Sequence, residues 1–388
     1  LRETPLLTKR SSQFDFVPVG GSLPSNPAKV SESTFLINDP NYAAVKGYYT
    51  AQNMIGLVTA SQIKDGLGTV VSRSETIYDE TGRSPGYRGN PTTARAWDST
   101  KGIVTNTNAY TSTSARFDTY GNQYEATDAK GNTTTTTFDA TYQAFPIQVT
   151  SPIPDPAGTY GSNTAFVTTA TFDSVTGLPL TTTDANGLET RIEYDSVTLR
   201  PLNTKTFYNN VQVGSTAETI YNDEPNDHWV KSRAQIDANL WAESITYFDG
   251  LGRAWKSEEV SSKGNIFVEK EFDAAGRLSR VSNPFRIGET KKWTTNVYDE
   301  ASRVKEVILQ DGSTFETDYG VSLTSVIGVV VTTTDPASKQ RRRIRNSRGE
   351  IIRVDEPTPS GTLGTITSPA LPTHYEYNAN GHMVRVDQ

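Results

Sequence analysis

A short motif recurs along this 388-residue chain: an aromatic residue, an aspartate, two variable residues, a glycine and an arginine. Complete copies begin at Tyr78, Phe248 and Phe272. The copy at Tyr298 has serine in place of glycine, and the copy at Phe117 has asparagine in place of arginine. Self-similarity of this kind is typical of repeat proteins, so the length divides better into short units than into domains of about 150 residues.

The copies lie about 20 to 27 residues apart, and weaker aromatic–aspartate copies at Phe138, Phe172 and Tyr194 fill the intervals. We predict a repeat array over residues 61–388, preceded by an atypical N-terminal segment over residues 1–60. Proline-rich stretches predict loop insertions near residues 151–163 and 356–370. The predicted structural motif consists of Tyr78, Asp79, Gly82, Arg83, Phe117, Asp118, Gly121, Phe248, Asp249, Gly252, Arg253, Phe272, Asp273, Gly276, Arg277, Tyr298, Asp299 and Arg303.

The chemistry of one unit predicts a β-hairpin. Apolar and polar residues alternate before the aromatic residue, which is typical of a strand. The aspartate accepts hydrogen bonds from the backbone N–H groups that follow it, and the glycine adopts a positive φ at little steric cost. These are the requirements of a type I turn closed by a glycine bulge. A second Asp-x-x-Gly turn follows the return strand at Asp128 and Asp184. Since no stretch has a sustained helical period, the sequence predicts an all-β antiparallel fold.

The motif, with Thr-Asp-x-x-Gly-Asn between copies, resembles the YD repeats of the Rhs family, which includes bacterial Rhs and wall-associated proteins, the BC components of insecticidal toxin complexes, and teneurins. The resemblance covers roughly residues 70–388. It implies a long curved or spiralling sheet that forms part of a hollow shell, often around a toxic polypeptide, with the repeat aromatics packed along the sheet. No self-cleavage motif or toxin follows the repeats, and residues 1–60 do not resemble a propeller. We therefore expect a segment of a larger shell or a short open member.

Composition excludes several function classes. The chain has no cysteine, which removes disulfides and cysteine-ligated metals, and only three histidines. Its net charge of -7 gives no general attraction to nucleic acid or to an anionic membrane. There is no apolar stretch of about 18 to 20 residues and no nucleotide-binding or nucleophile motif. We predict no cofactor, no catalytic site, no nucleic-acid partner and no membrane span. Because the sequence starts at Leu1, we expect a mature product or a fragment.

Four groups of side chains offer alternatives to a purely structural role. The alternating residues Arg341, Arg343 and Arg345 share a strand face and could bind a polyanion, although we favour a solvated sheet face. The arginines that follow the turns could form a ladder for anionic glycans, but we expect each to pair with a carboxylate of a neighbouring hairpin. The turn aspartates could bind calcium, although turn capping explains them. Tryptophans could stack on sugars or fill the space between sheet faces; they are Trp229, Trp241, Trp255 and Trp293.

Histidines give two weaker hypotheses. His374 and His382 flank a predicted turn and could form a metal site together with Glu376. His228 lies in an acidic loop and could form a carboxylate–histidine pair, although a surface loop is the simpler interpretation.

Three functions remain open at this point. The leading hypothesis is a non-catalytic shell protein, secreted or at the bacterial cell surface, that encapsulates or presents a toxin or effector polypeptide, with this cargo or the rest of a larger Rhs chain as its partner. The alternative is an extended adhesin or wall-associated module that binds a cell-surface glycan. The third is a glycan-degrading enzyme with paired carboxylates on a β scaffold.

Overall fold

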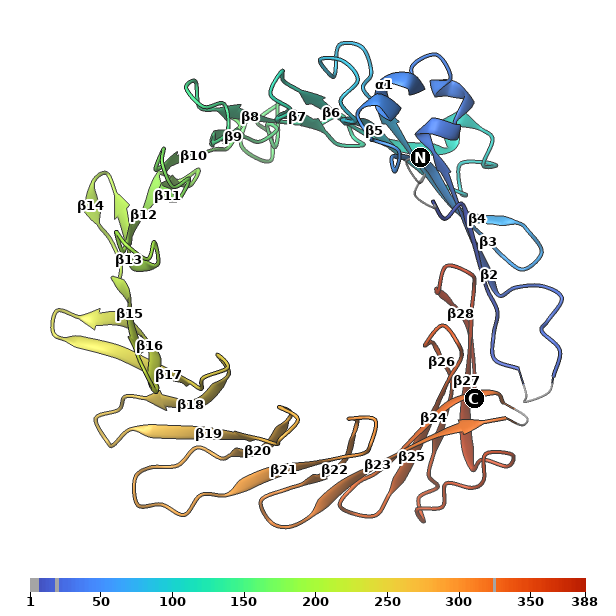
Figure 1. Cartoon of the computed structure of the whole chain (residues 1–388), viewed down its shortest axis with the longest axis vertical. Coiled ribbons are helices and arrows are strands. Elements are labelled where there is room, and N and C mark those ends of the chain that lie inside the picture. Colours follow the sequence, from blue (N-terminus) through green and yellow to red (C-terminus); the bar gives the residue numbers. More distant parts are fainter. Residues whose placement is uncertain (1–6, 18–20, 324–325) are drawn as a thin grey trace. The chain divides into compact units, whose positions relative to one another are not determined.

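The computed structural model describes residues 7–17, 21–323 and 326–388 (Figure 1). The described residues form 28 strands, one short α-helix, α1 (Lys46–Ala51), and three short 3-10 helices, η1 (Leu36–Asn38), η2 (Pro40–Tyr42) and η3 (Thr107–Ala109). The predicted all-β, antiparallel fold is confirmed, because strands dominate and the recorded strand pairs run antiparallel. None of the helices in these ranges is long and apolar enough to cross a membrane.

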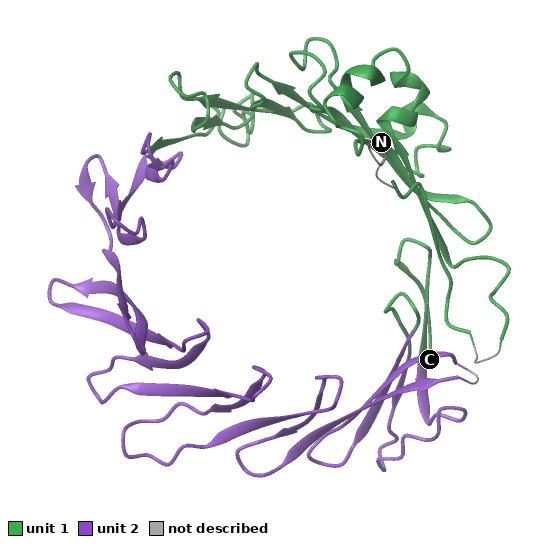
Figure 2. Cartoon of the chain, in the orientation of Figure 1, with its two compact units in different colours: residues 1–172, 346–352, 374–387 green, residues 173–345, 353–373, 388 purple. Residues whose placement is uncertain are grey.

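The chain forms two compact units (Figure 2). Unit 1 contains residues 1–172, 346–352 and 374–387. Strands β1 to β10 pair with their neighbours in chain order, and β27 pairs with β28. The strands of this unit are β1 (Arg10–Gln13), β2 (Lys29–Phe35), β3 (Val58–Lys64), β4 (Val70–Tyr78), β5 (Pro91–Trp97), β6 (Tyr110–Phe117), β7 (Gln123–Thr127), β8 (Thr133–Phe138), β9 (Pro146–Thr150), β10 (Val167–Phe172) and β28 (Met383–Asp387).

Unit 2 contains residues 173–345, 353–373 and 388, and its strands β11 to β25 also pair in chain order, with β14 as a short side strand. Strands β26 (Ile351–Glu356) and β27 (Leu371–Tyr377) contribute residues to both units. The strands of unit 2 are β11 (Pro179–Thr183), β12 (Leu188–Tyr194), β13 (Pro201–Tyr208), β14 (Val211–Gln212), β15 (Ala217–Glu224), β16 (Asp227–Asp237), β17 (Leu240–Phe248), β18 (Ala254–Glu259), β19 (Ile266–Phe272), β20 (Leu278–Ser282), β21 (Trp293–Tyr298), β22 (Val304–Ile308), β23 (Thr314–Ser322), β24 (Gly328–Thr334) and β25 (Gln340–Arg345).

The motif turns have the geometry of a type I turn with a glycine bulge. In the hairpin of β17 and β18, the Gly252 N–H donates to the Asp249 carbonyl and the Asp249 N–H donates to the Arg253 carbonyl. The Asp249 carboxylate accepts hydrogen bonds from the N–H groups of Leu251 and Arg253. Gly252 has a φ of 75°, and the strand register shifts beside it. The same aspartate bonding recurs at Asp128 and Asp184 in the turns between hairpins.

A matched pair of glycines tests this turn. Gly252→Ala places a side chain in the left-handed region, whereas Gly250→Ala lies in the same turn at an ordinary φ with open space around it. We expect Gly252→Ala to lower the free energy of unfolding by about 1 kcal/mol and Gly250→Ala to change it by less than half as much. Urea denaturation measures both, and equal losses would contradict the assigned turn.

Acid should weaken the turns, and Asp139 is the clearest case. Its carboxylate accepts N–H bonds, foremost from Tyr142 at 2.6 Å, and these lower its pKa from 3.8 to about 2. Because the pKa is lower in the folded chain, this contribution to stability is present above about pH 4 and is lost as the pH falls towards 2. We expect the melting temperature of Asp139→Asn to fall less steeply than that of the parent chain between these pH values. Parallel curves would exclude the effect.

The core is thin and concentrates in the N-terminal segment. Leu36, Tyr42 and Tyr49 form a buried cluster beside strands β3 to β5, and Leu36 and Tyr49 are fully buried. Residues 1–6 and 18–20 of the predicted N-terminal segment lie outside the described residues. The low helix content expected from the sequence is observed, and the helical turns between residues 36 and 51 carry the largest buried side chains of unit 1.

Candidate functional site

The turn arginines link each hairpin to the next. Arg277 donates from Nε to Asp273 Oδ2 of its own turn at 2.7 Å. Its guanidinium carbon lies 4.3 Å from the centre of the Tyr298 ring in the following hairpin, within the range of a cation–π interaction. The Tyr298 hydroxyl in turn donates to the carbonyl of Leu278, the residue after the arginine, at 2.8 Å. Tyr298 is therefore held by the end of the preceding hairpin through both its ring and its hydroxyl.

This arginine–aromatic ladder corrects one expectation from the sequence. The motif arginines were expected to pair with a carboxylate of a neighbouring hairpin, but Arg253, Arg277 and Arg303 pair with the aspartate of their own turn, because a five-residue turn returns the arginine to the free oxygen of that aspartate. They contact the neighbouring hairpin through its ring instead. The other contacts of the ladder are Arg253 over Phe272 and Arg303 over Tyr319. Arg200 lies over Tyr221 in the same way, and it also pairs with Asp223 of that neighbouring hairpin, as expected from the sequence.

A double-mutant cycle can isolate this contact. We expect Arg277→Met and Tyr298→Leu to couple by about 0.5–1 kcal/mol in the free energy of unfolding, because either change removes the same cation–π interaction. The half-exposed ion pair between Arg277 and Asp273 does not contribute to the coupling energy, because it is lost both in the Arg277→Met single variant and in the double variant. The control cycle combines Arg277→Met with Trp293→Leu, whose ring lies under Arg280. Similar coupling in both cycles would rule the ladder out.

Two motif copies depart from the common turn. At Phe117, the Asn122 amide takes the position of the arginine and donates to Asp118 Oδ2 at 3.0 Å, beside Gly121 at positive φ. At Tyr298, Ser302 adopts the left-handed φ of 62° that glycine takes elsewhere. The hairpin geometry is thus retained with other residues in the motif positions.

The copy at Tyr78 differs more. Asp79 is 9% exposed, has a φ of 54°, and begins a long loop in which its N–H donates to the Asn90 carbonyl. Its carboxylate accepts hydrogen bonds from four groups, namely the Tyr49 and Ser84 hydroxyls and the N–H groups of Gly89 and Asn90. The short turn expected here is absent, because Tyr49 of the helical segment takes the aspartate as its partner. Gly82 has positive φ, and the Arg83 carbonyl accepts from the Phe117 N–H.

The basic cluster on β25 divides between two faces. Arg341 and Arg345 are exposed and Arg343 is half-buried, so these alternate residues share the more open face, as their spacing predicts. Arg341 pairs with Glu356 at 2.8 Å, which reduces the positive charge of the predicted polyanion patch. Arg342, on the opposite face, is buried.

Arg342 belongs to a buried ionic cluster that the sequence did not predict. Asp355 is fully buried and lies 2.7 Å from Arg342 Nε and 2.7 Å from Arg353 Nε. The two guanidiniums also donate to backbone carbonyls of the loop between β26 and β27, at Thr365 and Ile366. This loop lies within one of the predicted insertions, and the cluster holds it in place.

The other candidate residues are not assembled into sites. The hairpin register places His374 opposite Asp387 and His382 in the turn, and no group of three histidine or acidic residues that could hold a metal is found within the described ranges. Trp241 and Trp293 are half-buried with a guanidinium over each ring, and Trp255, at 38% exposed, lies near Tyr247. His228 and Trp229 border an open pocket between the ends of β15, β16 and β17.

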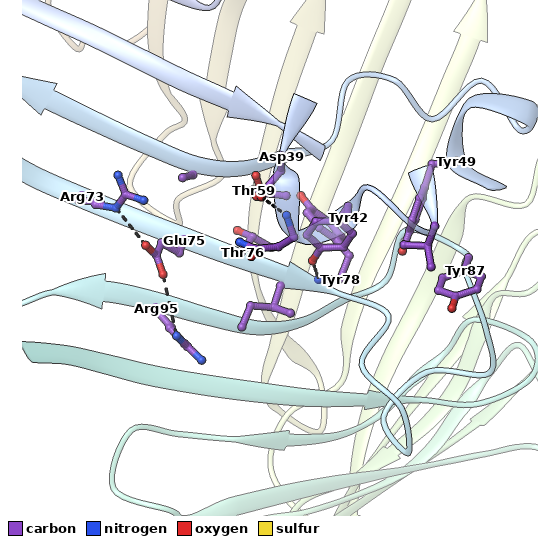
Figure 3. A pocket seen from close by; sticks show the side chains of 14 residues that line it. Asp39, Tyr42, Tyr49, Thr59, Arg73, Glu75, Thr76, Tyr78, Tyr87 and Arg95 are labelled. Atoms are coloured by element: carbon purple, nitrogen blue, oxygen red, sulfur yellow. Dashed lines mark hydrogen bonds and ion pairs between the residues drawn. The ribbon is translucent and has the colours of Figure 1, made fainter. Parts of the chain in front are cut away.

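A pocket of about 390 Å³ lies in unit 1 between the helical segment and strands β3 to β5 (Figure 3). Four tyrosines line it: Tyr42 from η2, Tyr49 from α1, Tyr78 from β4 and Tyr87 from the loop between β4 and β5. Figure 3 places the Tyr42 and Tyr78 side chains near its middle and Tyr49 and Tyr87 towards one end. Edge-to-face contacts join Tyr42 to Tyr49 and Tyr49 to Tyr87. Burial raises the pKa values of Tyr42, Tyr49 and Tyr78, so all three remain protonated hydrogen-bond donors near neutral pH.

The opposite end of the pocket carries charged side chains of both signs (Figure 3). Arg73 Nε lies 3.0 Å from Glu75 Oε1, and Arg95 Nη1 lies 4.0 Å from Glu75 Oε2. Asp39, which Figure 3 places nearer to Tyr42, adds a second carboxylate to the pocket, and this carboxylate accepts from the Asn41 N–H. These residues were not singled out from the sequence, where the only signal was the run of tyrosines between positions 42 and 87.

No family model and no curated protein matches the sequence. Several solved structures are similar to the chain. The chain is similar to the crystal structure of TcdB2-TccC3, with 11% identity and a TM-score of 0.36. It is similar to the same complex without its hypervariable C-terminal region, with the same values, and to a Photorhabdus luminescens Tc holotoxin pore, with 12% identity and a TM-score of 0.35. Each alignment covers 94% of this chain, which spans about a quarter of the length of those chains.

Proposed function

We propose that this chain is a non-catalytic wall of an Rhs-like shell, secreted or at the bacterial cell surface, that encloses or presents a polypeptide. The proposed mechanism is mechanical: a cargo held behind a continuous sheet has no access to its targets until it is released.

The architecture of each unit supports a wall. Each strand pairs with its chain neighbours, and the arginine–aromatic ladder joins successive hairpin ends. Few side chains are fully buried, so most of the sheet keeps both faces half-exposed. Cross-strand ion pairs such as Arg233 with Glu218 and Arg280 with Glu271 place charged groups on these faces. A polar surface offers few apolar patches on which an unfolded cargo would adhere.

Contacts between distant hairpins within unit 1 carry the proposal. The Asn380 side chain donates to the Val71 carbonyl at 2.9 Å, across 309 residues of sequence. The Ser347 hydroxyl donates to the Phe14 carbonyl at 2.9 Å, across 333 residues. Turns from late in the chain thus contact residues from its beginning within unit 1, and these contacts support the proposed wall.

Protease protection tests the proposal. The full chain is produced with an unfolded reporter polypeptide fused after Gln388, and digestion of the reporter by thermolysin is compared with digestion of the free reporter. We expect the fused reporter to be cut far more slowly, and the combined change Ser347→Ala and Asn380→Ala to restore cutting, because it removes the contacts between early and late hairpins.

Asn186→Ala is the matched control, since Asn186 occupies the same position of an Asp-Ala-Asn-Gly turn as Asn380 does in its Asn-Ala-Asn-Gly turn. The control should leave protection unchanged. If the fused and free reporters are digested at the same rate in an intact, folded chain, the shell proposal is wrong.

A further inference from the structure

The tyrosine-lined pocket of unit 1 has the composition of a ligand site and has no part in the wall proposed above. Its volume of about 390 Å³ lies at the lower end of the range of roughly 300–1,000 Å³ typical of small-molecule sites. Such sites combine apolar and aromatic walls with a few well-placed polar groups, and this pocket has both.

The charges of the pocket favour a neutral ligand. Its two guanidiniums, of Arg73 and Arg95, are balanced by the carboxylates of Asp39 and Glu75. Arg73 donates to two partners, Glu75 and Gln62, each at 3.0 Å. A ligand with a net charge would have to displace these pairs, whereas a neutral ligand with both donors and acceptors can bond to them as they stand.

Two donors at the pocket remain available. Tyr42 accepts the Tyr78 N–H at 2.7 Å, and no acceptor for its own hydroxyl proton is recorded among the described residues. Arg95 lies at the outer limit of an ion pair with Glu75, at 4.0 Å, and no hydrogen bond of its guanidinium is recorded among the described residues. Arg73, Glu75 and Arg95 lie on the opposite side of Tyr42 from Tyr49 and Tyr87 (Figure 3).

An amphipathic ring fits this arrangement. A pyranose has an apolar face of C–H groups, which stacks on an aromatic ring, and an edge of hydroxyls that both donate and accept. Tyr78, which is half-buried, and Tyr87, which is 38% exposed, supply the ring surface, and Tyr42, Glu75 and Arg95 supply partners for the hydroxyls. We propose that this pocket binds one or two sugar rings of a neutral glycan.

Titration of the full chain with neutral methyl glycosides tests the proposal, with saturation-transfer NMR and calorimetry as readouts. The probes are methyl glucoside, methyl galactoside, methyl mannoside and N-acetylglucosamine. At least one should bind saturably, with a dissociation constant in the millimolar range, and Arg95→Ala should weaken it by roughly tenfold, the loss expected for one charged hydrogen bond.

Arg116→Ala is the matched control, because Arg116 is a partly exposed arginine that pairs with Glu125 at 3.2 Å outside the pocket. It should leave binding unchanged, and melting curves should show that both variants fold. The proposal fails if none of the glycosides binds saturably, if both variants weaken binding equally, or if N-acetyltyrosinamide binds in their place. These outcomes leave the shell proposal untouched, because the reporter assay does not involve the pocket.

Discussion

Asp355→Asn should lower the free energy of unfolding by about 3–5 kcal/mol, the largest loss that we expect from a single substitution in this chain. Asp355 is fully buried and is the carboxylate partner of both Arg342 and Arg353, which are 7% and 3% exposed. The amide would leave two guanidiniums buried without a counter-charge, because the loop carbonyls that they also contact are neutral. Urea denaturation measures the loss.

The neighbouring residue supplies the control. Glu356 pairs with Arg341 at the surface, where both side chains are more than a third exposed, so Glu356→Gln should cost less than about 1 kcal/mol. Replacing Arg342, Arg353 and Asp355 together by Met, Met and Leu should recover much of the stability, since a buried ionic group can often be exchanged for apolar residues of similar volume. Comparable losses for Asp355→Asn and Glu356→Gln would show that the cluster is not a unit.

Asp79→Ala should cost about 2–4 kcal/mol, because four donors lose their acceptor in a buried place. The effect should reach the helical segment, since the Tyr49 hydroxyl bonds to Asp79 across 30 residues. Hydrogen exchange should therefore accelerate in residues 36–57 as well as in residues 79–90.

Two further variants serve as comparisons for Asp79→Ala. Tyr49→Phe removes one of the four bonds and should cost about 1 kcal/mol. Asp249→Ala removes the aspartate of an ordinary motif turn and should accelerate exchange near that turn alone. If Asp79→Ala behaves like Asp249→Ala, then the helical segment is held independently of this aspartate.

The regular parts of the fold were predictable because they depend on neighbouring residues. The turn at Asp249 needs an aspartate, a glycine three positions later and a strand on either side, and all of these lie within a few residues of sequence. Only one of the two contacts of each ladder arginine was predictable from the sequence. Spacing brings Arg277 back to Asp273, but the contact with Tyr298 depends on how neighbouring hairpins pair.

The sites depend on contacts that periodicity does not encode. Asp79 matches the motif, yet its conformation is decided by Tyr49, which lies outside any repeat. Arg342 has the same sequence context as Arg341 and Arg343, but its strand face turns it towards Asp355 and the loop at Thr365. Both cases are long-range interactions of polar residues, for which local patterns give no signal.

Pairing between chain neighbours has a consequence for how this protein folds and changes. Most contacts of a hairpin, such as that of β17 and β18, are made with the strands immediately before and after it. The free energy of unfolding should then be approximately a sum of terms for single hairpins and for the contacts between neighbouring hairpins. Folding can begin at any hairpin and propagate outwards. A duplicated or deleted hairpin would change the length of the array while leaving the strand pairing of the other hairpins intact, so this architecture can be resized during evolution by whole repeats.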